Sequence, residues 1–474
     1  KIYNLHLRPT NSGLGAGFFK STRTAHISDL EFVWENDLST PAIDPNVDLG
    51  IVGVVSADDL TPNTEIGDTE GSTFRNLTVK VGANGDGLLI NRTDKTIAGF
   101  GGIVGSATNS TIMNCNFYGS INAKLSNSSG AVYYGGLVAN GKTNNNNAPA
   151  GELNKIVSMK ISGGKVGNGK NTFTLTVGDC NNAYIGGAFG SLNGVTISSV
   201  DVAKLDEEVN GTIQVSIDNS SAQINIGGIG GYISNSGGEY AINGCATEAG
   251  IKVSSNADST IVKANVVNVG GMLAEANGVG SIKANYINSN LDLNNLQCST
   301  LTTSMGVAYA HGEGISLVEN LFNGTVSAEG NTKSSIYAGG AIGSLSGSAA
   351  LSETLTNVAI IVGSSSTKTF VAGGLVGGAG LNSEGVEDAN TKANIEIDSC
   401  VSLGRIVPIT SATATNTIIG GFVGKATSVT TTSSYSLSSI ITDGVGLGTI
   451  ADENYKVNAL YGTGGTAAGK TVQL

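Results

Sequence analysis

Apolar and polar residues alternate along this chain in short stretches that are separated by Gly, Asn and Ser. Residues 371–377 (VAGGLVG) show the simplest form, in which a glycine pair lies between apolar residues and a further glycine follows. Alternation over four to six residues, bounded by turn-forming residues, predicts short β-strands. Helical periodicity of any length is missing, so we expect an all-β protein.

The glycine-pair stretch recurs along the chain. Close copies lie at 98–105, 134–139, 185–190, 226–231, 269–274, 338–343 and 419–424, and weaker ones at 16–19, 49–53 and 305–309. The first residue of each glycine pair, or its equivalent in the weaker copies, lies at 16, 49, 101, 135, 186, 227, 270, 305, 339, 373 and 420. Five of the ten steps between these positions are 33 to 35 residues long. The repeating unit is therefore about 34 residues long, and such a period marks a solenoid, a propeller or an array.

Each unit has a second part, in which an apolar residue is followed two positions later, in most copies, by a small residue such as Asn or Ser, and which often ends in Gly-x-apolar. Examples are 112–121, 242–251, 317–326 and 397–406. A propeller blade needs four antiparallel strands in about 40 to 50 residues, and this unit is shorter with few tight hairpin signals. Recurrence at matching offsets favours a parallel β-helix, in which about eleven coils spaced by ~4.8 Å make a rod on the order of 50 Å long.

The glycine pair has a steric interpretation in a β-helix. Where a coil bends sharply, or where two walls pack closely, there is little room for a Cβ atom and φ is sometimes positive. We expect the two apolar residues that follow each pair to fill the interior.

Insertions follow the glycine-pair strand at 56–71, 140–150, 234–240 and 378–390. If the registers stack, all four leave the rod along one edge, where solenoid proteins place many of their partner contacts. The alternative interpretation is that loops are simply the places where insertions are tolerated.

Composition narrows the class of protein. A solenoid grows by one coil at a time, so 474 residues fit one elongated domain. With 69 Gly but 6 Pro and no Gly-X-Y period, collagen is excluded, and the hydrophobic fraction of 40% excludes disorder. The net charge of −12 and the absence of a Lys/Arg cluster argue against nucleic acid or an anionic membrane surface as partner.

No apolar run approaches the roughly 20 residues that span a bilayer. Because the first residue is Lys1, we interpret the chain as a processed or trimmed piece, and a missing signal peptide says nothing about export. The five cysteines are too few and odd in number for a disulfide framework, and they lack metal-binding spacing. Cys115, Cys245 and Cys400 share one repeat position, so we expect small residues buried in the core, as also for Cys180 and Cys298.

These units resemble GLUG repeats. The fullest match joins 101–105 (GGIVG), 112–115 (IMNC) and 119–121 (GSI), and 373–377 is the plainest core. The resemblance covers most of 99–430 and is diffuse before 99. It implies a right-handed parallel β-helix similar to pectate-lyase-like folds, and a secreted or surface-anchored bacterial protein. Repeats of this kind occur in adhesins and in the non-catalytic parts of large exported proteases. We expect one β-helix over 1–445, and a C-terminal strand or linker over 446–474.

An enzyme has to be weighed, because right-handed β-helices also include polysaccharide lyases and hydrolases. Hydrolases of this class resemble each other in an Asp-Asp pair and a His-Gly, and this chain contains Asp58-Asp59 and His311-Gly312. These lie about six coils apart, roughly 29 Å, whereas paired carboxylates must lie within ~10 Å. We interpret each as a surface loop residue, and no Arg/Lys cluster suits a lyase. The sequence predicts no catalytic, cofactor-binding or metal-binding residue.

The sequence therefore predicts a non-enzymatic adhesin or surface-interaction protein that binds glycan or a host protein through its loop-bearing edge. The alternative is a polysaccharide lyase or hydrolase whose site is assembled from separate coils. We expect a monomer without cofactor, secreted or anchored at the outer membrane of a Gram-negative bacterium, with no direct insertion of this segment into the membrane.

Overall fold

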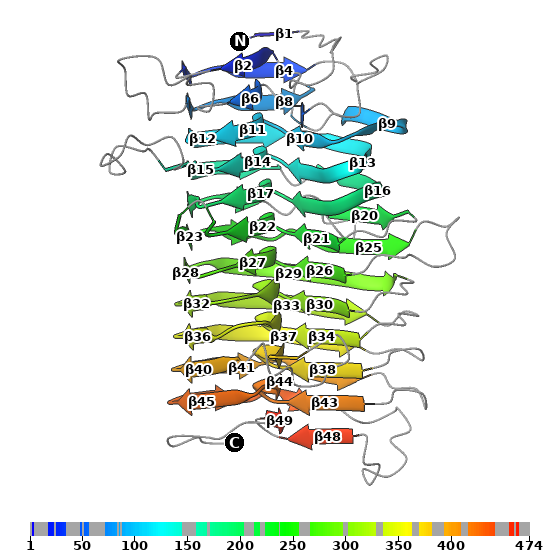
Figure 1. Cartoon of the computed structure of the whole chain (residues 1–474), viewed down its shortest axis with the longest axis vertical. Helices are drawn as coiled ribbons and strands as arrows, with labels where there is room; N and C mark the ends of the chain where they lie inside the picture. Colours follow the sequence, from blue (N-terminus) through cyan, green and yellow to red (C-terminus); the bar gives the residue numbers. More distant parts are fainter. Residues whose placement is uncertain are drawn as a thin grey trace.

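The structure is a computed structural model of the whole chain. It describes residues 2–3, 18–22, 25–34, 48–49, 52–55, 72–82, 85, 88–144, 158–167, 171–202, 213–218, 223–236, 238–255, 266–296, 302–328, 335–362, 369–381, 393–408, 416–440, 455–458 and 461–463. Every regular element in these residues is a β-strand, and the strands form one sheet of 37 and one of 12. Figure 1 shows the coils stacked one below another from the N-terminus to the C-terminus.

The smaller sheet contains one strand from each coil. Its strands, in spatial order, are β2 (Phe19–Thr22), β6 (Val52–Val55), β11 (Val104–Thr108), β14 (Val138–Lys142), β17 (Phe189–Asn193), β22 (Gly230–Ser234), β27 (Leu273–Asn277), β31 (Tyr309–Gly312), β35 (Ile342–Leu345), β39 (Val376–Ala379), β44 (Val423–Lys425) and β49 (Tyr461–Thr463). Spatial order equals sequence order, and each pair is parallel. The fold is a parallel β-helix, which confirms the predicted fold class.

The larger sheet contains two parts of each coil. Its strands of the glycine-pair column are β5 (Asp48–Leu49), β10 (Gly99–Gly101), β13 (Ser120–Gly135), β16 (Phe173–Gly186), β21 (Gln223–Gly227), β26 (Val266–Gly270), β30 (Thr302–Gly306), β34 (Ser335–Gly339), β38 (Thr369–Gly373), β43 (Asn416–Gly420) and β48 (Tyr455–Asn458). Corresponding glycines pair across successive coils, as Gly339 does with Gly373 and Gly373 with Gly420. The weak copy near 305 is in register at Gly306.

The remaining strands of the larger sheet form a long face. They are β1 (Ile2–Tyr3), β3 (His26–Ser28), β4 (Glu31–Trp34), β7 (Thr73–Arg75), β8 (Thr78–Val81), β9 (Leu88–Ile97), β12 (Thr111–Tyr118), β15 (Lys160–Val166), β18 (Thr196–Ser198), β19 (Asp201–Val202), β20 (Ile213–Ile217), β23 (Tyr240–Asn243), β24 (Ala246–Thr247), β25 (Ile251–Ser255), β28 (Gly280–Lys283), β29 (Tyr286–Asn295), β32 (Ile315–Val318), β33 (Leu321–Ala328), β36 (Ala349–Ser352), β37 (Leu355–Val362), β40 (Asn394–Asp398), β41 (Val401–Leu403), β42 (Arg405–Pro408), β45 (Ser428–Thr432), β46 (Tyr435–Ser436) and β47 (Ser439–Ile440).

Both sheets continue into the segment after residue 445. The strand β48 pairs with β43, and β49 pairs with β44. The smaller sheet therefore has twelve strands among the described residues, one more than the eleven recognisable copies of the glycine pair.

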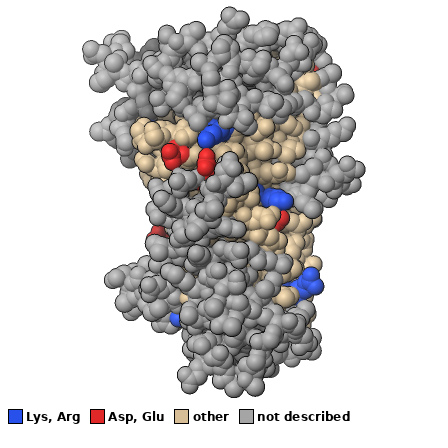
Figure 2. Space-filling model, turned by 90° about the vertical axis from the view of Figure 1, so that its right-hand side faces the viewer, with Lys and Arg blue, Asp and Glu red and all other residues tan. Residues whose placement is uncertain are grey.

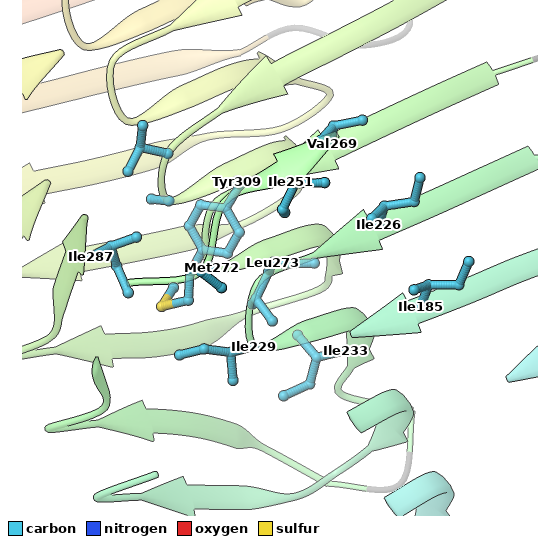
Figure 3. Close-up of a cluster of buried hydrophobic side chains, with 14 of the residues drawn as sticks. Ile185, Ile226, Ile229, Ile233, Ile251, Val269, Met272, Leu273, Ile287 and Tyr309 are labelled. Atoms are coloured by element: carbon cyan, nitrogen blue, oxygen red, sulfur yellow. The ribbon is translucent and has the colours of Figure 1, made fainter. Parts of the chain in front are cut away.

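Apolar side chains at corresponding positions stack into columns inside the rod. Ile185 pairs with Ile226 and Ile226 with Val269 in the larger sheet, and Figure 3 shows these three side chains in a row. One continuous cluster of buried residues extends from Phe32 to Val429. Because a fully buried aliphatic or aromatic side chain contributes about 1.5–3 kcal/mol, this column is the main source of stability.

The glycine pair is required by sterics at the bend between the two sheets. A Cβ atom on Gly186 would overlap the carbonyl oxygen of Phe189 in the same turn, and one on Gly187 would overlap the carbonyl oxygen of Gly228 in the next coil. Neither glycine has a positive φ. The expected lack of space is therefore confirmed, whereas left-handed backbone is not the reason for these glycines.

Left-handed backbone occurs at a different corner, within the long face. The residues with positive φ at this corner are Asp29, Asn76, Asn114, Gly163, Ser199, Gly244, Ala284, Glu319, Glu353, Ser399 and Ser433, one in each of eleven coils. The residue that follows the corner faces the interior. Cys115, Cys245 and Cys400 hold this position and are fully buried, as expected, and Cys180 is buried too. Cys298 lies outside the described residues.

Candidate functional site

Four insertions leave the rod from the same edge, which we call the loop-bearing edge. They follow β6, β14, β22 and β39, which are all strands of the smaller sheet. Strands of a parallel sheet run in one direction, so their carboxyl ends lie along one side of the rod. The prediction that the registers stack and bring these insertions to one edge is confirmed.

The start of one insertion is fastened to the previous coil. The backbone N–H of Asn144 donates to the Oδ1 of Asn109 at 2.7 Å, and the Nδ2 of Asn109 donates to the carbonyl oxygen of Asn144 at 3.1 Å. Residues 145–157 lie outside the described residues, as do 56–71 and 382–392. The part of the insertion at 234–240 that the structure describes includes Gly238, which has a positive φ and open space around it.

Other long connections leave the rod elsewhere. Residues 203–212 connect β19 to β20, and residues 256–265 connect β25 to β26, within the larger sheet. Insertions are therefore not confined to the loop-bearing edge, a feature that the sequence did not predict.

Few charged side chains are seen among the described residues of the face in Figure 2. The described Lys and Arg side chains on this face are scattered among Asp and Glu and form no basic patch. Ion pairs are found at the surface, such as Lys124 with Asp218 at 3.2 Å and Lys283 with Glu319 at 3.2 Å. Such exposed pairs contribute only about 0–1 kcal/mol each.

A second candidate site lies on the outside of the bend between the two sheets, and we call it the outer groove. The side chain two residues before each glycine pair shares this groove with the side chain five residues after the first glycine. In one coil these are Asn268 of β26 and Glu275 of β27, and both line the same cavity. Sharp bending at Gly270 and Gly271 thus brings two outward-facing rows together.

Polar side chains form two hydrogen-bonded groups in the middle of the outer groove. The Nε2 of Gln223 donates to the carboxyl group of Glu275. The Nδ1 of His311 is 2.7 Å from the Oγ of Ser344, which is also 2.9 Å from the Oγ of Ser304. These residues come from four successive coils, and they line a cavity of about 310 Å³.

Burial shifts the titration of both ionisable groups in this cavity. Desolvation raises the pKa of Glu275 to about 7, and the nearby side chain of Asn225 opposes the shift. Desolvation lowers the pKa of His311 to about 4. The two residues are paired in adjacent strands, β27 and β31. At pH 6 both side chains are therefore mainly uncharged.

Aromatic and apolar residues occupy the same repeat positions on both sides of the polar groups. Toward the N-terminus, the rings of Tyr133 and Tyr184 are stacked with centroids 5.6 Å apart, and Tyr232 follows at 5.2 Å from Tyr184. Toward the C-terminus, Tyr337, Val371 and Ile418 form a separate apolar cluster against which Leu381 packs. The residues at these repeat positions thus change from aromatic to polar to apolar along the rod.

Asp58-Asp59 and His311-Gly312 were considered above as the parts of a hydrolase site, and the described residues do not contain such a site. Asp58 and Asp59 lie outside the described residues. His311 lies in the strand β31 with a half-buried side chain, so its interpretation as a surface loop residue is wrong. Among the residues that the structure describes, no three His, Cys, Asp or Glu are grouped so as to hold a metal ion.

Glu275 and His311 were missed as a pair by sequence reasoning. Both hold the position five residues after the first glycine, where other copies carry Ser191, Ser344 or Gly378. An ionisable residue at a repeat position that is Ser or Gly in several other copies is the signal that could have found them, and Lys425 is a further example.

Comparison with protein-family models, curated proteins and solved structures finds no match to this chain. In the described part of the chain, no helix has the length and apolar character needed to cross a bilayer.

Proposed function

We propose that this chain is a non-enzymatic surface-interaction protein of the adhesin kind, which binds a glycan or a host protein through its loop-bearing edge. The observation that supports this proposal is that four insertions begin at the carboxyl ends of strands in one sheet. Such an edge carries several loops at intervals along a fixed support, an arrangement that suits recognition of an extended partner.

The rod itself is well suited to be the support. Its core is one continuous cluster, and each coil is hydrogen-bonded to its neighbours through parallel strands. A scaffold of this kind holds loops at fixed spacing, because each coil contacts mainly the coils before and after it.

The proposed location is the exterior of a Gram-negative bacterium, either secreted or anchored to the outer membrane. The GLUG-like motif is the main support for this location. The low content of charged residues, 13%, and the net charge of −12 further support a partner other than nucleic acid.

Replacing residues 145–157 with a short Gly-Ser linker tests the proposal. Binding to a glycan array and to a panel of host surface proteins is compared with that of the intact chain. The matched control replaces 256–265, which leaves the rod from the larger sheet. We expect lost or weakened binding in the first variant and unchanged binding in the control. Unchanged binding after replacement of all four edge insertions would overturn the proposal.

The alternative of a polysaccharide hydrolase is less well supported by the outer groove. Hydrolysis of a glycosidic bond uses two carboxyl groups about 5 to 10 Å apart. Among the described residues that line the cavity, Glu275 is the one carboxyl group. Release of products from a panel of acidic and neutral polysaccharides would nevertheless replace the adhesin proposal with this alternative.

A further inference from the structure

The cavity in the outer groove contains a buried polar atom without a partner. Asn268 lines the cavity with 1% of its surface exposed. Its Nδ2 donates to the Oδ1 of Asn225 at 2.9 Å, whereas its own Oδ1 accepts no hydrogen bond. A buried acceptor of this kind costs about 1–3 kcal/mol if it stays unsatisfied, so a ligand that donates a hydrogen bond here would be stabilised.

The groups around Asn268 offer both donors and acceptors. Gln223 and Glu275 belong to the coils toward the N-terminus, and Ser304, His311 and Ser344 to the coils toward the C-terminus. Amide, carboxyl, hydroxyl and imidazole groups can each exchange hydrogen bonds with hydroxyl groups. A ligand with several hydroxyl groups would therefore find partners in both sets of coils.

Apolar side chains complete the cavity. Val266, Tyr337, Leu345 and Leu381 are part of its lining, and Tyr337 belongs to the apolar cluster described above. A sugar ring has hydroxyl groups at its edge and C–H groups on its faces, so it can use polar and apolar walls together. The volume of about 310 Å³ is at the small end of ligand pockets, which suits one sugar residue rather than a long chain.

The lining argues against other ligand classes. It contains the Glu275 carboxyl group and no Lys or Arg among the described residues, so a phosphate, sulfate or uronate would not be neutralised. A purely apolar ligand would leave the Oδ1 of Asn268 without a partner. A metal ion has too few ligands, since only Glu275 and His311 of the described lining are of the usual metal-binding types.

We propose that the outer groove between Gln223 and Leu381 is a binding site for one uncharged sugar residue, which donates a hydroxyl hydrogen bond to the Oδ1 of Asn268. The site shares Gly378 and Leu381 with the edge insertion at 378–390, but its polar groups belong to the rod, and the inference does not rest on the function proposed for that edge. The sugar can be a free monosaccharide or the end of a glycan.

Calorimetric titration of the intact chain with single sugars tests the inference. The probes are glucose, galactose, mannose, fucose and N-acetylglucosamine, with glucosamine and glucuronate as charged counterparts. We expect at least one uncharged sugar to bind, and its charged counterpart to bind at least tenfold more weakly. Binding of none of the uncharged sugars, or preference for a charged one, would overturn the inference.

Two variants locate the site. Asn268→Ala removes the acceptor and should weaken sugar binding about tenfold, as expected for loss of one hydrogen bond. Asn394→Ala, at an exposed position in β40, is the matched control and should leave binding unchanged. Equal binding by Asn268→Ala and the intact chain would contradict the assignment.

A third variant tests whether a loss of sugar binding is due to the cavity itself and not to altered folding. Ser346 lines the cavity and is half-buried, so Ser346→Phe should fill the cavity and abolish sugar binding. The thermal transition of this variant should match that of the intact chain. Replacement of 145–157 should leave sugar binding unchanged even if it abolishes partner binding, which separates this inference from the proposal for the edge.

Discussion

The Oδ1 of Asn320 accepts hydrogen bonds from both the backbone N–H and the Nδ2 of Asn285, each at 3.0 Å. The two residues hold the same position in successive coils, directly after the left-handed corner of the long face. The Oδ1 of Asn285 in turn accepts from the backbone N–H of Cys245 at 2.8 Å. Side-chain amides thus connect three coils inside the rod, where Asn285 and Asn320 are both buried.

The asparagine stack predicts a large loss of stability for Asn285→Ala. The variant loses three side-chain bonds, with Cys245, with Asn320 and, at 3.1 Å, from its Nδ2 to the carbonyl oxygen of Ile242, and it keeps the backbone bond to Asn320. At about 1 kcal/mol for each bond, we expect a loss of about 3 kcal/mol in the free energy of unfolding, measured by urea denaturation. Asn290→Ala removes an exposed partner of Thr325 and should cost less than about 1 kcal/mol. Equal losses in the two variants would contradict a special role for the stack.

A second prediction concerns the glycine pair. A Cβ atom on Gly227 would overlap the carbonyl oxygens of Gly230 and Met272, and backbone cannot move aside as a flexible side chain can. We expect Gly227→Ala to cost about 3 kcal/mol or more. In Gly178→Ala the new methyl group would meet the flexible side chains of Lys124 and Ser126, so the thermal transition should change little. A tolerated Gly227→Ala would mean that the bend is looser than described.

The outer groove predicts two opposite dependences of stability on pH. The pKa of Glu275 is about 7 in the folded protein and about 4.5 in the unfolded chain. The folded protein therefore binds the proton more tightly, and the contribution of Glu275 to the free energy of unfolding falls as pH rises between these values. The pKa of His311 is about 4 in the folded protein and about 6.5 in the unfolded chain. The contribution of His311 to the free energy of unfolding therefore rises as pH rises between these values.

Single variants should separate the two contributions. Relative to the intact chain, Glu275→Gln should become more stable as pH rises from 4.5 to 7, and His311→Gln should become less stable from pH 4 to 6.5. Urea denaturation across this range measures both differences. The facing residues Tyr184 and Tyr232 have pKa values raised by burial, so they do not titrate in this window. Differences that do not vary with pH would show that neither group is buried as described.

Buried thiols provide a fourth prediction. Desolvation raises the pKa of Cys115, Cys245 and Cys400 to about 11, and all three are fully buried. Because the thiolate is the reactive form, these residues should resist an alkylating reagent at pH 8 in the folded protein and react fully in denaturant. Peptide mapping by mass spectrometry reports each site separately. Rapid labelling of Cys245 in the folded protein would contradict its place in the core.

The stacking of coils could be predicted from the sequence because it depends on recurrence alone. In a parallel sheet, register places corresponding residues beside one another, as with Gly339 and Gly373. The same reasoning places Cys115, Cys245 and Cys400 at one buried position. It also brings the four insertions to one edge without any knowledge of their conformation.

The outer groove could not be predicted, because it depends on the angle at which the chain turns between two sheets. Asn268 and Glu275 are seven residues apart, and a gentle bend at Gly270 would have pointed them away from each other. His311-Gly312 resembles a turn when it is considered alone. The pairing of β31 with β27 and β35 makes it a strand, and only the neighbouring coils reveal this.

The central claim is that corresponding residues of successive units lie on top of one another, and engineered disulfides test it most directly. Asn290 pairs with Thr325, and Thr325 with Ala359, at exposed or half-exposed positions of the long face. Adjacent strands are ~4.8 Å apart, within the range that a disulfide bridges, whereas residues two coils apart exceed its limit of about 7 Å. Under mild oxidation, the Asn290→Cys/Thr325→Cys variant should form an intramolecular bond and Asn290→Cys/Ala359→Cys should not. A bond in the second variant without one in the first would contradict the stacked β-helix.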